Sequence, residues 1–294
     1  VMHADDRLIA KYSIEDLIRQ QKQGNFAPST RLSWSLRNVR CFGDPATIFV
    51  GTAGNDIYQM DMDIAVERLK HDEYGKHPDV VLTPRTIGCG FKPGASIVSL
   101  ACHPEKLECV TTATGGCVRR WDIDAGARPN ENARSPAYML SARYISGSDC
   151  LCVDYSHDGK DIAIGLSDGR IVFADSVRLN IKAGEVYGGQ RGPARALKFA
   201  PKSIAGKTVF AVAGGSGFID LVSVSGDSGA IEGPGKVLAR VKCDFIGGTP
   251  TLDWHCNADL LMTNATHQDL EWTVDSDTII KVVPSSHGEQ YEAF

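Results

Sequence analysis

The chain has 294 residues, 43% of them hydrophobic, and a formal net charge of −5 at pH 7. A nucleic-acid-binding domain is normally basic, so this acidic balance predicts no nucleic-acid partner. The sequence contains no long run of uncharged apolar residues, which predicts no membrane-spanning helix and no membrane partner.

One short pattern recurs along the chain: an apolar run, a turn rich in Gly, Asp, Asn and Ser, and a second apolar run. The clearest copy is VTTATGGCVRRWDI, at residues 110–123. A repeat of about 40–50 residues that carries a Trp-Asp pair is the sequence signature of a β-propeller. In chain order, the copies begin at Val1, Phe49, Val110, Ala163, Ala211 and Leu261.

When the six copies are aligned, two positions of the repeat, which we call columns, have a structural interpretation. The first apolar residue after the turn, such as Val118, is expected to be buried. Three residues later, a large side chain is expected to pack between neighbouring sheets, and the short polar residue that follows is expected to satisfy backbone groups at the strand end. The sixth copy fits worst, because Asp269 falls in the apolar column unless the alignment slips by one residue. The residues expected between the sheets are Tyr12, Met60, Trp121, Ala174, Val222 and Trp272.

Each copy after the first is preceded by a further candidate strand that ends in a turn such as Ser156-His157-Asp158-Gly159. These strands are predicted at residues 37–42, 97–103, 150–156, 194–200 and 251–255. We therefore predict an all-β fold, a WD40-type β-propeller over residues 1–294 with six visible blade units. The ring would be incomplete or seven-bladed and part of a larger protein. Blade cores are expected near residues 1–14, 37–62, 97–124, 150–176, 194–225 and 251–275.

The alternative to a propeller is an all-β sandwich with similar hairpins, which the regular spacing of the repeat disfavours. Irregular stretches interrupt the repeat. Residues 14–33 and 64–75 begin with short helical patterns, whereas residues 128–135 and 226–235 read as solvent loops. Such insertions are either spacers or the places where a propeller presents its binding surface.

The cysteines indicate packing rather than metal binding. There are nine, with no CxxC pair and no Cys/His cluster at zinc-ligand spacing, so we predict no metal site. A reduced cysteine behaves as a small hydrophobe in a core, and a reducing, cytoplasmic setting fits this usage. The sequon at Asn264 is therefore interpreted as chance. Cysteines in or beside predicted inner strands are Cys41, Cys102, Cys152 and Cys256.

The sequence contains no G-x-S-x-G elbow, H-E-x-x-H pair, phosphate-binding loop or calcium loop. We accordingly expect no catalytic residue, no cofactor and no enzymatic activity. Two basic pairs, Arg119–Arg120 and Arg195 with Lys198, are candidate partner contacts, although a solvated strand edge is the commoner role of such pairs. Binding residues remain unknown from the sequence.

Three stretches carry a more particular pattern. Residues 141–177 read SARYISGSDCLCVDYSHDGKDIAIGLSDGRIVFADSV, residues 251–272 contain Leu252-Asp253-Trp254, and residues 39–62 contain VGTAGNDIYQMDM. Together these stretches resemble the echinoderm microtubule-associated protein-like (EMAP-like) family of WD-repeat proteins. The resemblance implies tandem propellers and association with microtubules through a propeller face.

The chain also departs from that family. Gly247-Gly248 and Gly189-Gln190 stand where the family pattern has Gly-His, so the buried His–Ser/Thr–Asp–Trp network of WD repeats cannot form in those blades and other packing must hold them. The family's hydrophobic motif, which lies before its propellers, is not visible. The first unit lacks a preceding inner strand, so we expect a chain that starts inside a blade.

Two functions follow. The first is a cytoplasmic, cytoskeleton-associated protein that binds tubulin or microtubules; because the outer surface of tubulin is acidic, its binding face should be basic. The second is a general scaffold that binds peptides of other proteins without tubulin contact. A basic patch on one face favours the first function, whereas a central opening lined by aromatic residues and Arg favours the second.

Overall fold

The fold is known from a computed structural model. It describes residues 2–4, 7–12, 36–42, 47–52, 57–61, 81–82, 85–88, 97–106, 108–122, 138–145, 147–188, 192–204, 206–215, 217–225, 231–242, 250, 252–254, 260–265, 268–274 and 279–284. The helical patterns expected in 14–33 and 64–75, the loop at 128–135, and Cys256 lie outside these residues.

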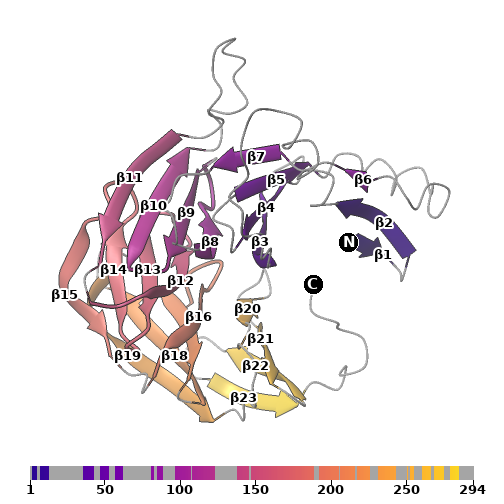
Figure 1. The fold of residues 1–294 in the computed structure, drawn as a ribbon. Helices are drawn as coiled ribbons and strands as arrows, with labels where there is room; N and C mark the ends of the chain where they lie inside the picture. Colours follow the sequence, from indigo (N-terminus) through magenta and orange to yellow (C-terminus); the bar gives the residue numbers. More distant parts are fainter. Residues whose placement is uncertain are drawn as a thin grey trace.

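Every regular element in the described ranges is a strand, and five four-stranded antiparallel sheets follow one another along the chain. Figure 1 shows them side by side around a central opening, each with its first strand innermost. This arrangement confirms the predicted all-β propeller and excludes a two-layer sandwich. From inner to outer strand, the sheets are β3 (Leu36–Phe42), β4 (Thr47–Thr52), β5 (Ile57–Asp61) and β7 (Arg85–Gly88); β8 (Ile97–Cys102), β9 (Glu108–Ala113), β10 (Cys117–Asp122) and β11 (Tyr138–Tyr144); β12 (Cys150–Tyr155), β13 (Asp161–Leu166), β14 (Ile171–Asp175) and β15 (Ile181–Tyr187); β16 (Ala194–Phe199), β17 (Val209–Gly214), β18 (Phe218–Ser225) and β19 (Ile231–Lys242); and β20 (Leu252–Trp254), β21 (Leu260–Ala265), β22 (Gln268–Val274) and β23 (Ile279–Pro284).

The N-terminal sheet is smaller. It consists of β1 (Met2–Ala4), β2 (Arg7–Tyr12) and β6 (Val81–Leu82), and β2 pairs with β6 in parallel. No strand precedes β1 in the described part of this sheet. In the same described ranges, no helix is long and apolar enough to cross a membrane.

Strand register shows that the recurring sequence windows are structurally equivalent. In four of the five four-stranded sheets, the first residue of the repeat lies opposite the fifth residue of the inner strand, and in the last sheet it lies opposite the final residue of β20. The pairs are Phe49 with Arg40, Val110 with Ala101, Ala163 with Asp154, Ala211 with Lys198, and Leu261 with Trp254. The repeat seen in the sequence is therefore the repeat of the fold.

The sixth copy is offset by one residue, as its poor fit indicated. Leu270 lies opposite Thr263, just as Val118 lies opposite Thr112, so Leu270 and not Asp269 fills the apolar column. The same offset corrects one expectation: Thr273, and not Trp272, occupies the register position that Trp121 has in its own sheet. The β21–β22 hairpin has a different turn length, and a one-residue change moves a side chain to the other face of a sheet.

A β-bulge recurs at the start of four inner strands, and the sequence did not reveal it. The register shifts between Leu36 and Asn38, Ile97 and Ser99, Cys150 and Cys152, and Ala194 and Ala196. A bulge adds one residue to a strand and turns it away from its partner. The added residues are Arg37, Val98, Leu151 and Arg195.

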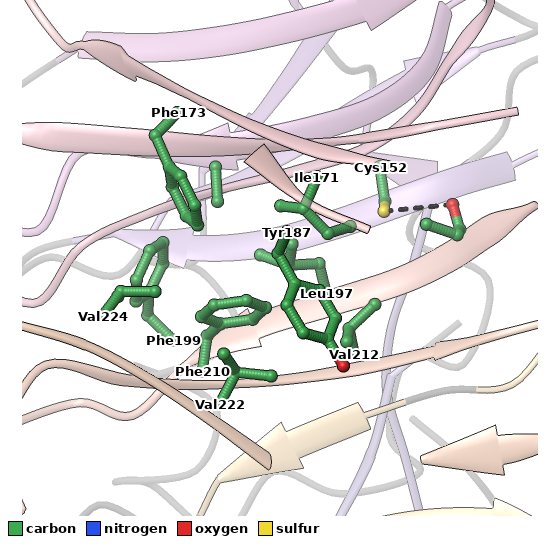
Figure 2. Packing of buried hydrophobic residues seen from close by; sticks show 12 residues of the cluster. Cys152, Ile171, Phe173, Tyr187, Leu197, Phe199, Phe210, Val212, Val222 and Val224 are labelled. Carbon is green, nitrogen blue, oxygen red and sulfur yellow. Dashed lines mark hydrogen bonds between the residues drawn. The ribbon is translucent and has the colours of Figure 1, made fainter. Parts of the chain in front are cut away.

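The core lies between neighbouring sheets. Figure 2 shows the cluster between the β12–β15 and β16–β19 sheets, where Phe210 packs against three other rings. Its ring centroid lies 5.8 Å from that of Phe173, 6.1 Å from that of Tyr187 and 5.7 Å from that of Phe199. The thiol of Cys152 donates to the Ala194 carbonyl at 3.3 Å (Figure 2). Cys152 is thus a core residue, as predicted.

In the blades from β8 to β19, whose side chains are described, the residues expected between the sheets are buried. Trp121 is 5% exposed, and its indole N–H donates to the Thr111 hydroxyl at 2.9 Å. Ala174 and Val222, at the equivalent position, are buried. Asp175, one residue further, accepts backbone N–H groups at 2.6–3.1 Å and thereby closes the loop after β14.

A buried ionic contact joins the β12–β15 blade to the β16–β19 blade, which Gly189-Gln190 precedes in place of Gly-His. Asp220 on β18 is fully buried, and it accepts the Tyr187 hydroxyl at 2.7 Å and two Arg240 N–H groups at 2.6 and 2.8 Å. The Arg240 guanidinium also lies 5.5 Å from the Phe218 ring centroid. Because Tyr187 comes from β15 of the preceding blade, this group is one contact that holds the β16–β19 blade in place without that histidine.

One loop expectation was wrong in part. Residues 226–235 were expected to be a solvent loop, but β19 begins at Ile231, which lies opposite Ser225. The long β18–β19 hairpin extends the outer edge of its blade. Gly235, with a φ of 75°, makes this extension possible. It packs so closely against the Val222 and Val224 side chains that a Cβ would clash there.

Candidate functional site

Hairpin turns of three consecutive blades lie at one end of the propeller, which we call the turn face. It contains the β8–β9 turn (103–106), the β12–β13 turn (156–160) and the β16–β17 turn (200–204 and 206–208). The β14–β15 loop lies at the same end, because the Ser176 N–H donates to the Lys160 carbonyl at 2.9 Å.

The β12–β13 turn has the structure that its sequence predicts. The Ser156 hydroxyl donates to Asp158 at 2.7 Å, and the Gly159 N–H donates to the Ser156 carbonyl at 2.9 Å. Gly159 has a φ of 69°, which disfavours other residues. Burial opposes ionisation of Asp158, but hydrogen bonds from Ser156 and Lys160 outweigh it and lower the pKa of this carboxyl.

His103 locks the first turn against the second. Its Nδ1 accepts the backbone N–H groups of Glu105 and Lys106, both at 3.1 Å, and its ring centroid lies 5.1 Å from that of Tyr155. The ring covers Gly159 so closely that a Cβ there would collide with it. His103 is 3% exposed, and burial, with Lys106 nearby, lowers its pKa. The two turns therefore form one packed unit.

The third turn is tied to the second blade through its inner strand. The Phe199 N–H, at the end of β16, donates to the Asp154 carboxylate of β12 at 2.9 Å. Further along, Ile204 and Lys207 exchange backbone hydrogen bonds at 2.9 and 3.0 Å, which close the turn without using side chains. The turn face thus presents rigid loops over three blades.

The turn face is basic. Glu105 is its one exposed acidic residue in the described ranges; Glu108, Asp158 and Asp175 are partly covered, and Asp158 pairs with Lys160 at 3.2 Å. Asp161 is buried and pairs with Lys182 at 3.0 Å. Exposed cationic side chains outnumber this acid; they are Lys106, Lys160, Arg178, Lys202 and Lys207.

The opposite end of the propeller has mixed charge. Asp149 accepts the Gly115 N–H at 2.6 Å, and Asp168 accepts the Ser148 hydroxyl at 2.6 Å and Arg170 Nε at 2.8 Å. Burial opposes ionisation of Asp168, but its hydrogen bonds and Arg170 prevail and lower its pKa to about 2. The acids at this end are therefore committed to holding loops together.

Of the bulge residues at the start of the inner strands, Arg195 is exposed, and Val98 and Leu151 are half-buried. None of the four bulge positions carries an aromatic residue. Among the bulge positions whose side chains are described, Arg195 thus provides an exposed cation and no position provides an aromatic ring.

The structure separates the two basic pairs singled out in the sequence. Arg120 is 9% exposed and internal, with its guanidinium 2.7 Å from Glu108 and 2.9 Å from the Val177 carbonyl of the next blade. Lys198 is half-buried, and its carbonyl accepts the Trp254 indole N–H at 3.1 Å. Of these residues, Arg195 alone is exposed, and the turn-face lysines were missed because nothing in the sequence placed their turns together.

No cluster of His, Cys, Asp or Glu that could hold a metal ion occurs among the described residues. Five cysteines in these ranges are not disulfide-bonded: Cys102, Cys109, Cys117, Cys150 and Cys152. Burial raises the pKa of the Cys150 and Cys152 thiols to about 12, which suits packing groups.

No family model matches the chain. The chain is similar to a chain in the crystal structure of the mitotic checkpoint complex, with a TM-score of 0.58 and 15% sequence identity over 87% of this chain. The match spans 66% of the length of that chain. At this identity the likeness concerns the fold alone, and it agrees with the WD-repeat β-propeller that the sheets define. Since 1374 chains of solved structures match, the fold by itself selects no function.

Proposed function

We propose that the protein is a non-catalytic interaction scaffold that binds microtubules through the basic turn face. The observation that carries the proposal is the excess of exposed cations on the turns of three consecutive blades, in a chain whose net charge is −5. Charge is thus distributed unevenly, as in a protein that is acidic overall but binds an acidic surface.

Rigidity supports the same function. The turns are held by His103 on Gly159, by Ser156 and by the Asp154 carboxylate, so ordering the loops costs little entropy when a partner binds. The EMAP-like sequence resemblance supplies the identity of the partner, and the basic face supplies the chemistry that such a partner requires.

Co-sedimentation with polymerised tubulin tests the proposal. We expect the full-length protein to pellet with microtubules at low salt and much less at high salt, because exposed charges about 10 Å apart are strongly screened at 0.1 M salt. Failure to pellet at low salt would remove the proposal.

Charge reversal identifies the face. Lys202→Glu with Lys207→Glu should weaken microtubule binding by about tenfold or more, because each reversal replaces attraction by repulsion at the interface. Backbone groups close this turn, so the fold should be retained. Lys242→Glu is the matched control for the single variant Lys202→Glu, since both change the net charge by the same amount; Lys242 is exposed at the opposite end of the propeller, opposite Phe218 in the register. Equal loss in both variants would assign binding to net charge and not to the turn face.

A second candidate is a scaffold that binds acidic peptides at the central opening. The exposed Arg195 near the start of the inner strand β16 favours it. Arg195→Glu distinguishes the two functions, because it should leave microtubule pelleting unchanged if the turn face is the contact. Loss of pelleting in Arg195→Glu, with Lys202→Glu unaffected, would place the partner at the opening instead.

A further inference from the structure

Two cysteines lie directly opposite each other on the inner hairpin of one blade. Cys102 at the end of β8 is the Cα partner of Cys109 in β9. The same position recurs in the other blades, where large apolar residues occupy at least one side. The equivalent pairs are Cys41 with Ile48, Tyr155 with Ile162, and Phe199 with Phe210.

Side chains at this position touch across the hairpin. The Phe199 and Phe210 ring centroids are 5.7 Å apart, and Tyr155 and Ile162 belong to one buried cluster. Directly opposite residues of an antiparallel pair point to the same face of the sheet. The two thiols therefore lie where other blades place contacting side chains.

Backbone hydrogen bonding fixes the type of pair. The His103 N–H donates to the Glu108 carbonyl at 2.9 Å, so His103 and Glu108 are a hydrogen-bonded pair. The next pair along the ladder, Cys102 and Cys109, is then of the non-hydrogen-bonded type, in which Cα atoms are about 4.5 Å apart. Disulfides bridge Cα atoms about 4.4–6.8 Å apart, so the backbone can accept a bond without moving the strands.

We propose that Cys102 and Cys109 form a reversible cross-strand disulfide when the protein meets a disulfide oxidant such as oxidised glutathione. Cys102 is half-buried and reachable, whereas Cys109 is fully buried. The Cys102 thiolate attacks one glutathione sulfur and releases one glutathione thiolate, which leaves a mixed disulfide. The Cys109 thiolate then attacks the Cys102 sulfur and releases the second glutathione. The two protein thiols lose two protons and two electrons, and one oxidised glutathione becomes two reduced ones.

The order of attack follows from burial. Burial, with Cys102 nearby, raises the pKa of the Cys109 thiol well above its usual value, so this residue resolves the mixed disulfide and does not initiate the reaction. The bond closes the hairpin that carries His103 and Lys106. Oxidation would thus fix the first turn of the turn face, a property that does not depend on what that face binds.

Peptide mapping of the intact chain after incubation with oxidised glutathione tests the proposal. Unreacted thiols are alkylated before digestion with trypsin, which cuts after Lys106, between the two cysteines. Peptides 86–106 and 107–119 should then run as one species that separates on reduction, and fragmentation should place the bond between Cys102 and Cys109.

Substitutions distinguish this bond from others, since the two peptides also contain Cys89 and Cys117. Cys102→Ala and Cys109→Ala should each abolish the linked species, whereas Cys117→Ala should retain it. If Cys109→Ala does not fold, the more exposed Cys102→Ala gives the same test. A linkage that survives Cys102→Ala, a stable glutathione adduct at Cys102 without linkage, or no oxidation at all would each overturn the proposal.

Discussion

Trp121 provides the sharpest test of how the blades hold together. Its side chain is 5% exposed, and a tryptophan buries about 150–250 Å². At about 25 cal/mol per Å², this burial contributes at most about 4–6 kcal/mol of hydrophobic free energy to folding. Trp121→Ala also removes the hydrogen bond to Thr111 and leaves that buried hydroxyl without its donor. We expect a loss of about 3–5 kcal/mol in the free energy of unfolding, the range of large core truncations.

A denaturant titration followed by far-UV circular dichroism measures this loss without relying on tryptophan fluorescence, which the substitution changes. Trp121→Phe should cost less, about 1–3 kcal/mol, because it keeps a ring but not the N–H donor. Leu140→Ala on the adjacent β11, where the side chain is 43% exposed, should cost under about 0.5 kcal/mol. A loss below about 1 kcal/mol for Trp121→Ala would refute burial of this ring between sheets.

Two further stability predictions follow from buried polar groups. Asp220→Asn should lower the free energy of unfolding by about 2–4 kcal/mol in denaturant titrations. This is somewhat less than for a fully buried ion pair, because the Arg240 side chain is 43% exposed and can rehydrate. Tyr187→Phe should lower it by about 1.5–3 kcal/mol, and a neutral result for both variants would mean that the contact does not join the blades. Because burial lowers the pKa of His103 in the folded state, its contribution to stability is complete above the unfolded pKa of about 6.5 and is lost as pH falls through the folded pKa. His103→Gln should flatten the pH dependence of unfolding in that window, and an unchanged slope would contradict it.

The repeat was legible in the sequence because each blade must solve the same local problem. Gly159 has a positive φ in its turn, Asp175 closes a loop with its carboxylate, and Trp121 is a buried ring. Each requirement restricts a residue type at a fixed offset, so the pattern alone predicted strands, hairpins and the class of fold. Where the hairpin length changed, between β21 and β22, the offset misplaced Trp272 by one residue.

Proximity between blades was decided by tertiary structure alone. No periodicity links His103 to Gly159, Asp154 to Phe199, or Tyr187 to Asp220, because these pairs meet only when sheets are arranged around the ring. The same is true of the turn face: Lys106, Lys160 and Lys202 are ordinary surface lysines in the sequence, and packing gathers their turns at one end. Local backbone chemistry thus determined the blade, whereas contacts between residues distant in the chain determined the surface that the blades present.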